Sequence, residues 1–163
     1  MARPKLDRYD LGILSALQRD GRMSKVKLAA AVHLTPSPCW ERLKRLEDTG
    51  VITGYQARID PKKLGPATVV MVEIELREHA ATDFERFESA IRDAPEIIDC
   101  QATGGGVDYL MKVVVPDIDA YQRLIDGLLE RGLGIARYYS YVVTKSVKEG
   151  EGLPLHVLAG GSA

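Results

Sequence analysis

The polar side chains best placed to do chemistry lie in and beside the stretch SPCWERLKR, residues 37–45. At 100° per residue along a helix, two sets of side chains in this region separate to opposite sides. The apolar set comprises Cys39, Leu43 and Leu46. The polar set comprises Ser37, Glu41, Lys44 and Arg45. Arginine and lysine donate hydrogen bonds to guanine edges or phosphates, and glutamate accepts one from cytosine. The spacing therefore predicts a helix that presents a base-reading face to the major groove of DNA.

Four further residues belong to the predicted DNA surface. Trp40 and Arg42 lie on the flanks of the same helix. Trp40 either shields that flank, which we favour, or contacts a sugar or a thymine methyl group. Lys25 and Lys27 precede the helix and would attract phosphates in a salt-sensitive manner. A basic helix is often only a solvated surface, so the interpretation depends on the neighbouring elements.

A second stretch, CQATGGGVDYLMK at residues 100–112, holds three consecutive glycines before an aspartate. No Gly-Lys-Ser/Thr follows, and the glycines lead into a strand, so a phosphate-binding loop is not expected. The glycines either supply a turn with positive φ or let a small ligand approach the backbone. The predicted effector-binding residues are Thr103, Gly104, Gly105, Gly106, Val107, Asp108 and Tyr109.

The sequence contains no evident catalytic or metal-binding constellation. The three histidines, at positions 33, 79 and 156, are scattered and have no nucleophile or metal-type spacing around them. The two cysteines, Cys39 and Cys100, are far apart, which suits a reducing cytoplasm. We therefore predict a protein that is not an enzyme and uses no metal or cofactor. Without a long apolar run or a secretory signal, no membrane partner is expected and a cytoplasmic location is predicted.

Three short helices are predicted to position the DNA-reading face. The turn between the second and third has the length of a helix-turn-helix, and His33 within it is expected to be left-handed. Residues 51–59, VITGYQARI, are rich in β-formers around a glycine and favour a small hairpin or wing. The predicted N-caps of the three helices are Asp7, Ser24 and Thr35.

The second half of the chain alternates between strands and helices in the order βαββαβ, typical of a ferredoxin-like α+β fold. Thr82 and Glu85 favour a capping box at the first of these helices. The predicted strands cover residues 67–76, 96–103, 108–115 and 135–147, and the predicted helices cover residues 82–94 and 116–132.

The two helices of such a fold cover one face of the sheet, although the strands carry apolar side chains on both faces. An uncovered apolar sheet face is a partner surface, and homodimerisation about a two-fold axis is the simplest way to cover it. Alternatively, the face packs under the tail or the linker. The residues expected on this face are Met71, Tyr138, Tyr139 and Tyr141.

Charge is divided between two parts of the chain, although the net charge is only -1. Residues 1–65 hold 13 Lys/Arg against 7 Asp/Glu, and residues 66–163 hold 9 against 16. That asymmetry is expected where one part meets a polyanion. The predicted organisation is a winged helix-turn-helix domain (1–59), a linker (60–66), a ferredoxin-like effector-binding and oligomerisation domain (67–148) and a fraying tail (149–163).

Residues 6–55, from LDRYDLGIL to EDTGVITGY, strongly resemble the N-terminal domain of the Lrp/AsnC (feast/famine) bacterial transcription regulators. The resemblance continues through VDYLMKVVVPDIDAYQRLI and YYSYVV, and so covers roughly residues 5–148. It implies a winged helix-turn-helix that binds double-stranded DNA, joined to a ferredoxin-like sensing domain. It also implies dimers that often assemble into tetramers or octamers and bind an amino acid or a related metabolite between dimers.

Two positions depart from the family pattern. The family usually has glycine where His33 stands. Its sensor loop commonly runs Gly–acid–x–Asp, and here Gly106 occupies the acid position while Asp108 and Tyr109 match. Loss of one carboxylate is expected to weaken recognition of a cationic amino group, which favours an amino-acid derivative as the effector.

Three other classes of function compete with a regulator of amino-acid metabolism. An architectural protein that wraps DNA without sensing a ligand would use the same basic domain. An enzyme would need a catalytic constellation that the scattered histidines do not supply. A stand-alone metabolite-binding module would leave the basic N-terminal domain unexplained. We therefore expect a sequence-specific, effector-responsive transcription regulator.

Overall fold

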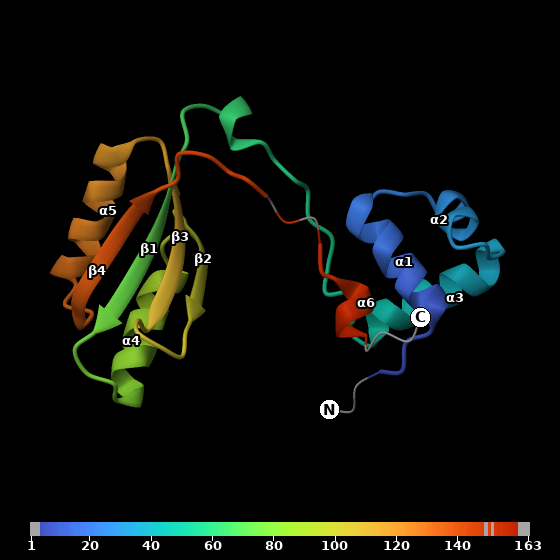
Figure 1. The fold of residues 1–163 in the computed structure, drawn as a ribbon, viewed down its shortest axis with the longest axis horizontal. Helices are drawn as coiled ribbons and strands as arrows, with labels where there is room; N and C mark the ends of the chain where they lie inside the picture. The colour runs from blue at the N-terminus through green and yellow to red at the C-terminus, as the bar shows by residue number, and fades with distance from the viewer. Residues whose placement is uncertain (1–3, 149, 151, 160–163) are drawn as a thin grey trace. The chain divides into compact units, whose positions relative to one another are not determined.

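The computed structural model describes residues 4–148, 150 and 152–159. The chain divides into two compact units, residues 1–58 with 147–163 and residues 59–146 (Figure 1). Residues 1–3 of the predicted DNA-binding domain, and residues 149, 151 and 160–163 of the predicted tail, lie outside the described residues. The first unit holds the predicted recognition helix, and the second holds the predicted effector loop.

The first unit contains three helices around one apolar core: α1 (Arg8–Arg19), α2 (Lys25–Ala31) and α3 (Pro36–Asp48). Asp7 caps α1 by accepting a hydrogen bond from the Asp10 N–H at 3.0 Å. Ser24 caps α2 by accepting one from the Lys27 N–H at 3.3 Å. These N-cap predictions are confirmed. Thr35 occupies the N-cap position of α3, but its side chain makes no capping hydrogen bond.

His33 forms the turn between α2 and α3 with a φ of 56°, which confirms the left-handed prediction. Its N–H donates to the Ala30 carbonyl at 3.2 Å, and the Leu34 N–H donates to the Ala29 carbonyl at 2.9 Å. Such bonds satisfy carbonyls that the end of a helix leaves free. Because Leu34 then packs against the helical core, the turn fixes α3 relative to α2.

Residues 51–59 follow α3 as an extended segment that forms no strand pairing, so the β-hairpin considered for the wing is not formed. Val51 and Ile52 pack against the helical core instead. The Ile52 N–H donates to the Leu46 carbonyl at 3.0 Å, and the Tyr55 hydroxyl donates to Glu47 at 2.8 Å. The β-forming residues are therefore held by α3 rather than by a partner strand.

Residues 152–159 of the predicted tail do not simply fray, contrary to the prediction. Leu155–Leu158 form the short helix α6, which contacts α1, and Leu155 packs against the core of the first unit. A four-residue helix is too short to show an amphipathic period, so the sequence pattern could not reveal it.

The second unit is a four-stranded antiparallel sheet in the order β2-β3-β1-β4. A short 3-10 helix, Pro61–Lys63, precedes it within the predicted linker. The elements are β1 (Thr68–Leu76), α4 (Ala81–Arg92), β2 (Ile97–Ala102), β3 (Tyr109–Val115), α5 (Ile118–Glu130) and β4 (Ile135–Val142). Their order is βαββαβ, which confirms the predicted ferredoxin-like fold.

Both helices of this unit lie on one face of the sheet (Figure 1), and a single apolar core joins them to it. Val70, Val72 and Ile74 of β1 are buried there with Phe87 of α4 and Ile125 of α5. Because side chains alternate along a strand, the intervening residues of β1 point to the opposite face.

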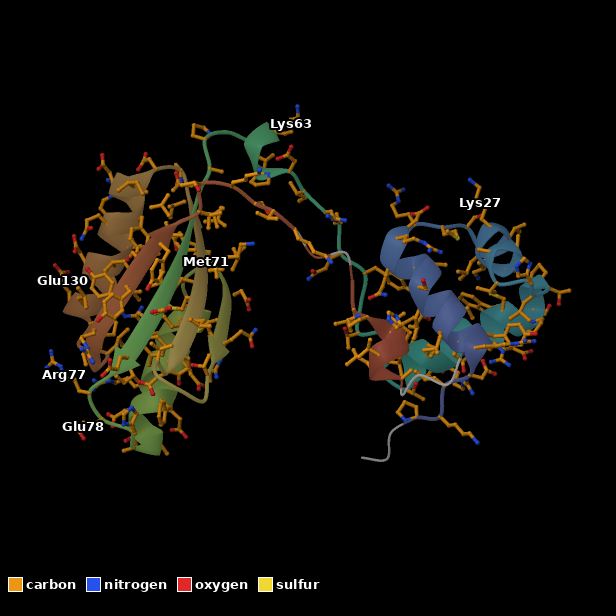
Figure 2. The ribbon with its side chains drawn as sticks, viewed as in Figure 1. Lys27, Lys63, Met71, Arg77, Glu78 and Glu130 are labelled. Atoms are coloured by element: carbon orange, nitrogen blue, oxygen red, sulfur yellow. The ribbon has the colours of Figure 1, made fainter. Side chains whose placement is uncertain are left out.

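That opposite face, which we call the outer face of the sheet, carries both apolar and charged side chains. Met71, labelled in Figure 2, is exposed and pairs with Tyr141 on β4 and Lys112 on β3. Tyr139 is exposed as well. Tyr138 packs against the helix-side core instead, so its predicted place on the outer face is wrong. Adjacent residues of a strand cannot share a face, which accounts for the correction.

The predicted capping box of Thr82 and Glu85 is not formed. Helix α4 begins at Ala81, and its N-cap, Ala80, has no side chain able to cap. The Ala80 carbonyl accepts the Asp83 N–H at 2.9 Å. The box requires its threonine in the extended N-cap position, whereas Thr82 is already helical.

Replacing His33 by glycine is expected to raise the free energy of unfolding by about 1 kcal/mol, because a residue with a Cβ is strained in the left-handed region. His33→Ala is the matched control, since it keeps the Cβ and removes the imidazole. Urea denaturation of the full chain measures both. Equal stabilisation by the two variants would contradict the strain explanation.

Candidate nucleic-acid interface and ligand-binding loop

Helix α3 separates its side chains as its spacing predicts. Cys39, Leu43 and Leu46 are buried in the core of the first unit. The exposed residues on the other side are Ser37, Glu41, Lys44 and Arg45. This side offers hydrogen-bond donors and one acceptor on a helix that is anchored along its opposite side, which is the arrangement required for reading base edges.

Trp40 is held by a cation from the preceding helix. The Nζ of Lys25 lies 3.2 Å from the centroid of the Trp40 ring. A cation over the face of an indole is attracted by the ring's quadrupole, so this contact ties the start of α2 to α3. The contact agrees with the flank-shielding interpretation of Trp40. Lys27, labelled in Figure 2, is exposed on α2.

A buried carboxylate joins α1 to α3. Asp10 is 1% exposed, and its two oxygens lie 2.9 Å from Nη1 of Arg42 and 2.6 Å from Nη2 of Arg45. Arg42 also pairs with Asp7 at 2.7 Å. Burial acts to raise the pKa of Asp7, but hydrogen bonds from the Asp10 N–H and from Arg42 hold that pKa below its usual value. A buried charge is tolerated only when it is paired and hydrogen-bonded, so these arginines stabilise the position of Asp10.

Arg42 and Arg45 therefore have a role inside the protein as well as a predicted role on DNA. The Arg42 side chain is 28% exposed and the Arg45 side chain 51% exposed. A guanidinium held by a carboxylate keeps further N–H donors in a fixed orientation. Glu41 and Lys44 form no ion pair in the part of the chain that the structure describes. Substituting these two residues tests DNA contact without disturbing the Asp10 contacts.

Residues 103–108 connect β2 to β3 as a loop that is closed at its base. The Thr103 N–H donates to the Asp108 carbonyl at 2.8 Å, and the Asp108 N–H donates to the Ile74 carbonyl at 2.9 Å. The Thr103 hydroxyl also donates to the Val107 carbonyl. The ends of the loop are thus fixed to each other and to β1, while residues 104–106 are exposed.

The Asp108 carboxylate is already engaged within the chain. Its Oδ2 accepts the Leu76 N–H at 2.7 Å, where the pairing of β1 with β4 becomes irregular. Its Oδ1 lies 3.1 Å from Nε2 of His79, whose ring lies 5.8 Å from that of Phe84. Asp108 therefore shapes the loop in addition to its predicted role in ligand binding. Sequence reasoning left His79 unassigned, because only the β1–α4 connection brings it to this carboxylate.

The three glycines are not required by the conformation of the loop. Residues 104–106 form a bend between β2 and β3, but none of them has a positive φ, so that part of the prediction is wrong. A Cβ built on any of them would meet no atom within 4 Å. Neither a positive φ nor packing within the chain accounts for glycine at these three positions.

Tyr109 begins β3 and is buried against α4. Its hydroxyl donates to Glu88 at 3.0 Å, and its ring centroid lies 4.6 Å from that of Phe87. Burial, together with the hydrogen bond and negative charge of Glu88, raises the pKa of Tyr109 well above its ordinary value. The hydroxyl stays protonated and directed at Glu88, so any contact with an effector at this position falls to other atoms of the residue.

The two cysteines are free, one buried and the other half-buried. Burial raises the pKa of both thiols, that of Cys100 to about 11, which disfavours the nucleophilic thiolate. Among the described residues, no three His, Cys, Asp or Glu side chains gather closely enough to hold a metal ion. None of the helices in the described ranges has the length and apolarity needed to span a membrane.

Two protein families match the chain. Residues 6–53, which contain α1 to α3, match a winged helix-turn-helix DNA-binding family. Residues 69–153, which contain the loop between β2 and β3, match the Lrp/AsnC ligand binding domain. The boundary between the two matches falls in the segment that connects the two structural units.

Individual proteins are similar over nearly the whole chain. The transcriptional regulatory protein DoeX of Halomonas elongata is 56% identical over 144 residues, covering 88% of this chain and 91% of its own. The leucine-responsive regulatory protein of Escherichia coli K12 is 44% identical and covers 88% of each chain. A solved transcriptional regulator from Neisseria meningitidis, in complex with L-Met, gives a TM-score of 0.88 at 34% identity and covers 94% of this chain and 99% of its own.

Substitution of Asp10 by asparagine is expected to lower the free energy of unfolding by about 2–3 kcal/mol, because two arginines lose a buried counter-charge. Urea denaturation of the full chain measures the change. Asp7→Asn is the matched control. It keeps an N-cap acceptor and removes an exposed ion pair, so it is expected to cost less than about 1 kcal/mol. Equal losses for the two variants would contradict the central role of Asp10.

Proposed function

Because the chain belongs to the Lrp/AsnC family of transcription regulators, we propose that α3 reads an operator and that residues 103–109 hold an amino acid or an amino-acid derivative. The observation that carries the proposal is the division of α3 into a buried apolar side and an exposed polar side within a helix-turn-helix. A polar side on an anchored helix can enter the major groove without disturbing the core. A cytoplasmic location follows from this proposal, because the DNA lies there.

On this proposal, specificity and affinity come from different residues. Glu41, Lys44 and Arg45 reach base edges or phosphates, with Ser37 at the start of the helix. Lys27 supplies salt-sensitive attraction to the phosphate backbone. Lys25 and Trp40 contact each other and hold α2 against α3, so their proposed contribution is to position the other residues. Arg42 contributes in the same way through Asp7 and Asp10.

A homodimer formed through the outer face of the sheet accounts for the exposed apolar side chains there. Met71, Leu110, Tyr139 and Tyr141 are exposed on this face although both helices cover the other one. A two-fold axis would place like patches together and present two copies of α3 to half-sites about 34–36 Å apart or a multiple of that distance. Assembly of dimers into tetramers or octamers belongs to the same proposal.

The proposed effector approaches the backbone of residues 104–106. No side chain fills the space beside these glycines, and the loop is fixed at both ends. The similar Neisseria regulator binds L-Met, which supports an amino acid or derivative as the ligand class. Gly106 supplies no carboxylate, and Asp108 is partly committed to Leu76 and His79. We therefore favour a ligand whose amino group is modified, or one whose amino group does not contact the loop.

Effector control requires unequal binding to two states. A ligand shifts the population of a DNA-binding arrangement only to the extent that it binds that arrangement more tightly. A ligand placed where subunits approach each other satisfies this condition, because its contacts depend on how the subunits are arranged. The proposed site and the proposed oligomer thus depend on each other.

Replacing Lys44 by alanine is expected to weaken binding to a selected operator duplex by about tenfold and to lower the slope of log affinity against log salt by about one, because one cationic contact is lost. Fluorescence anisotropy at several salt concentrations measures both. Arg123→Ala, on exposed α5, is the matched control for loss of one positive charge. An unchanged affinity for Lys44→Ala would contradict the assignment of α3.

Replacing Gly105 by alanine is expected to weaken effector binding at least tenfold while leaving unliganded stability within about 0.5 kcal/mol, because the added Cβ meets no atom of the chain. A thermal-shift screen of the standard amino acids and their Nα-acetyl derivatives identifies the ligand used. Gly127→Ala is the matched control, since a Cβ there also meets open space. Normal ligand-induced thermal shifts for Gly105→Ala would exclude this loop as the effector site.

If no ligand changes the operator footprint, the alternative of an architectural DNA-binding protein is favoured.

A further inference from the structure

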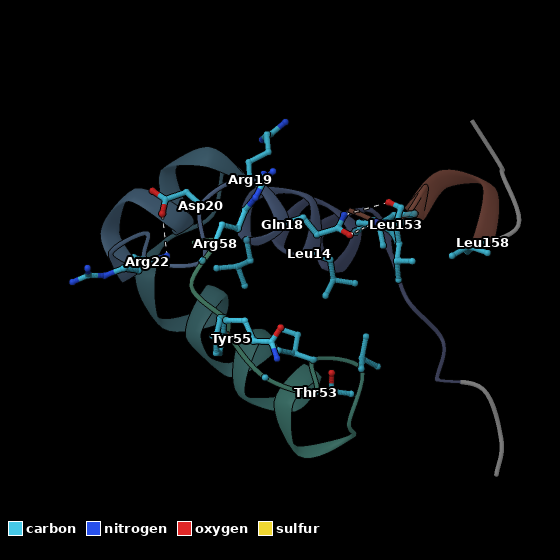
Figure 3. A pocket seen from close by; sticks show the side chains of 18 of the residues that line it. Leu14, Gln18, Arg19, Asp20, Arg22, Thr53, Tyr55, Arg58, Leu153 and Leu158 are labelled. Carbon is cyan, nitrogen blue, oxygen red and sulfur yellow. Dashed lines mark hydrogen bonds between the residues drawn. The ribbon is translucent and has the colours of Figure 1, made fainter. Parts of the chain in front are cut away.

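The segment after β4 returns to α1 and is bound there by one glutamine. Oε1 of Gln18 accepts the Leu153 N–H at 2.5 Å, and Nε2 of Gln18 donates to the Leu153 carbonyl at 3.3 Å. Figure 3 shows these two bonds between the labelled residues. A single side-chain amide thus pairs with both backbone groups of one residue, as a neighbouring strand would.

Gly152 makes this approach possible. Its φ is +100°, a conformation that residues with a Cβ rarely adopt. A Cβ at this position would also lie 2.6 Å from Oε1 of Gln18. The backbone conformation therefore requires a glycine here, and the Gln18 side chain lies directly against it.

Apolar contacts continue from the same point. Leu153, Leu155 and Leu158 line a groove that is also lined by α1 and by residues 51–58 (Figure 3). Leu155 packs against the core of the first unit, whereas Val157 on the same short helix is 64% exposed. Leu155 therefore anchors the segment on the first unit, while Leu153, Val157 and Leu158 stay more than half exposed.

Because the C-terminal segment belongs to the first unit, two stretches of chain connect the two units. It leaves the first unit after residue 58 and re-enters it at residue 147. Without the contacts at Gln18 and Leu155, the DNA-binding unit would be joined to the second unit by the 59–67 connection alone. A second connection reduces the volume that a tethered domain can explore.

We propose that residues 152–158 form a clasp that docks on α1 and restrains the DNA-binding unit. Restraint before binding lowers the entropy lost when two copies of α3 engage two half-sites together. The clasp thereby strengthens binding to paired half-sites and leaves binding to a single half-site unchanged. This consequence rests on the proposed two-site mode of DNA binding, whereas the docking itself does not.

The docking is tested by hydrogen–deuterium exchange on the full chain. Leu155→Ala and Gln18→Ala are expected to increase the exchange rate of the peptide covering residues 152–159 about tenfold, because the first removes apolar contact and the second removes both hydrogen bonds. Val157→Ala, on the exposed side of the same helix, is expected to leave exchange unchanged. Unchanged exchange in both test variants would overturn the proposal.

The effect on DNA is measured with the same variants on two duplexes, one with two half-sites and one with a single half-site. Leu155→Ala is expected to weaken binding to the paired duplex about fivefold to tenfold and to leave the single-site affinity within error. Faster exchange with unchanged paired-site affinity would overturn the restraining role. Equal losses on both duplexes would also overturn it. If the wild-type chain bound neither duplex, the proposed DNA mode would fail, while the exchange data would still decide whether the segment docks.

Discussion

The position of α3 depends on one buried negative charge. Asp10 lies in the core of a small three-helix unit, where an unpaired carboxylate would cost more than the unit could tolerate. Among the described residues, its counter-charges come from α3, through Arg42 and Arg45. The pairing therefore fixes the rotation of α3 about its own axis, and with it the set of side chains that faces outward. The cation–π contact from Lys25 adds a second restraint from α2. The predicted DNA surface is thus held by charges on three helices rather than by apolar packing alone.

The sheet of the second unit imposes a different constraint. Two helices can cover one face of four strands, and the alternation along β1 leaves Met71 on the other. One ion pair is already formed on that face, since Nη2 of Arg137 lies 2.8 Å from Oε2 of Glu75. An ion pair that is already formed can be covered by a partner at less cost than an isolated charge. The proposed second copy of the chain would therefore cover this ion pair together with the exposed apolar side chains.

The sequence predicted the features that follow from local periodicity. It identified the buried and exposed sides of α3, the βαββαβ order and the left-handed turn at His33, because each depends on residues close together in the chain. Features that depend on distant residues escaped prediction. His79 joins Asp108 only once the sheet has formed, and Gln18 binds Leu153 across 135 positions. The docking of residues 152–158 was missed for the same reason.

The structure narrows the possible reasons for three consecutive glycines in the loop between β2 and β3. The sequence indicated both a strand connection with positive φ and a backbone that a small ligand can approach. None of the three glycines has a positive φ, so a left-handed backbone does not explain them. A Cβ added at any of them would meet no atom within 4 Å, so packing within the chain does not explain them either. The hydrogen bonds of Thr103 and Asp108 fix the two ends of the loop, and residues 104–106 are exposed between them. At the proposed effector site, selectivity would come from groups around the loop, among them Asp108 and its contact with His79.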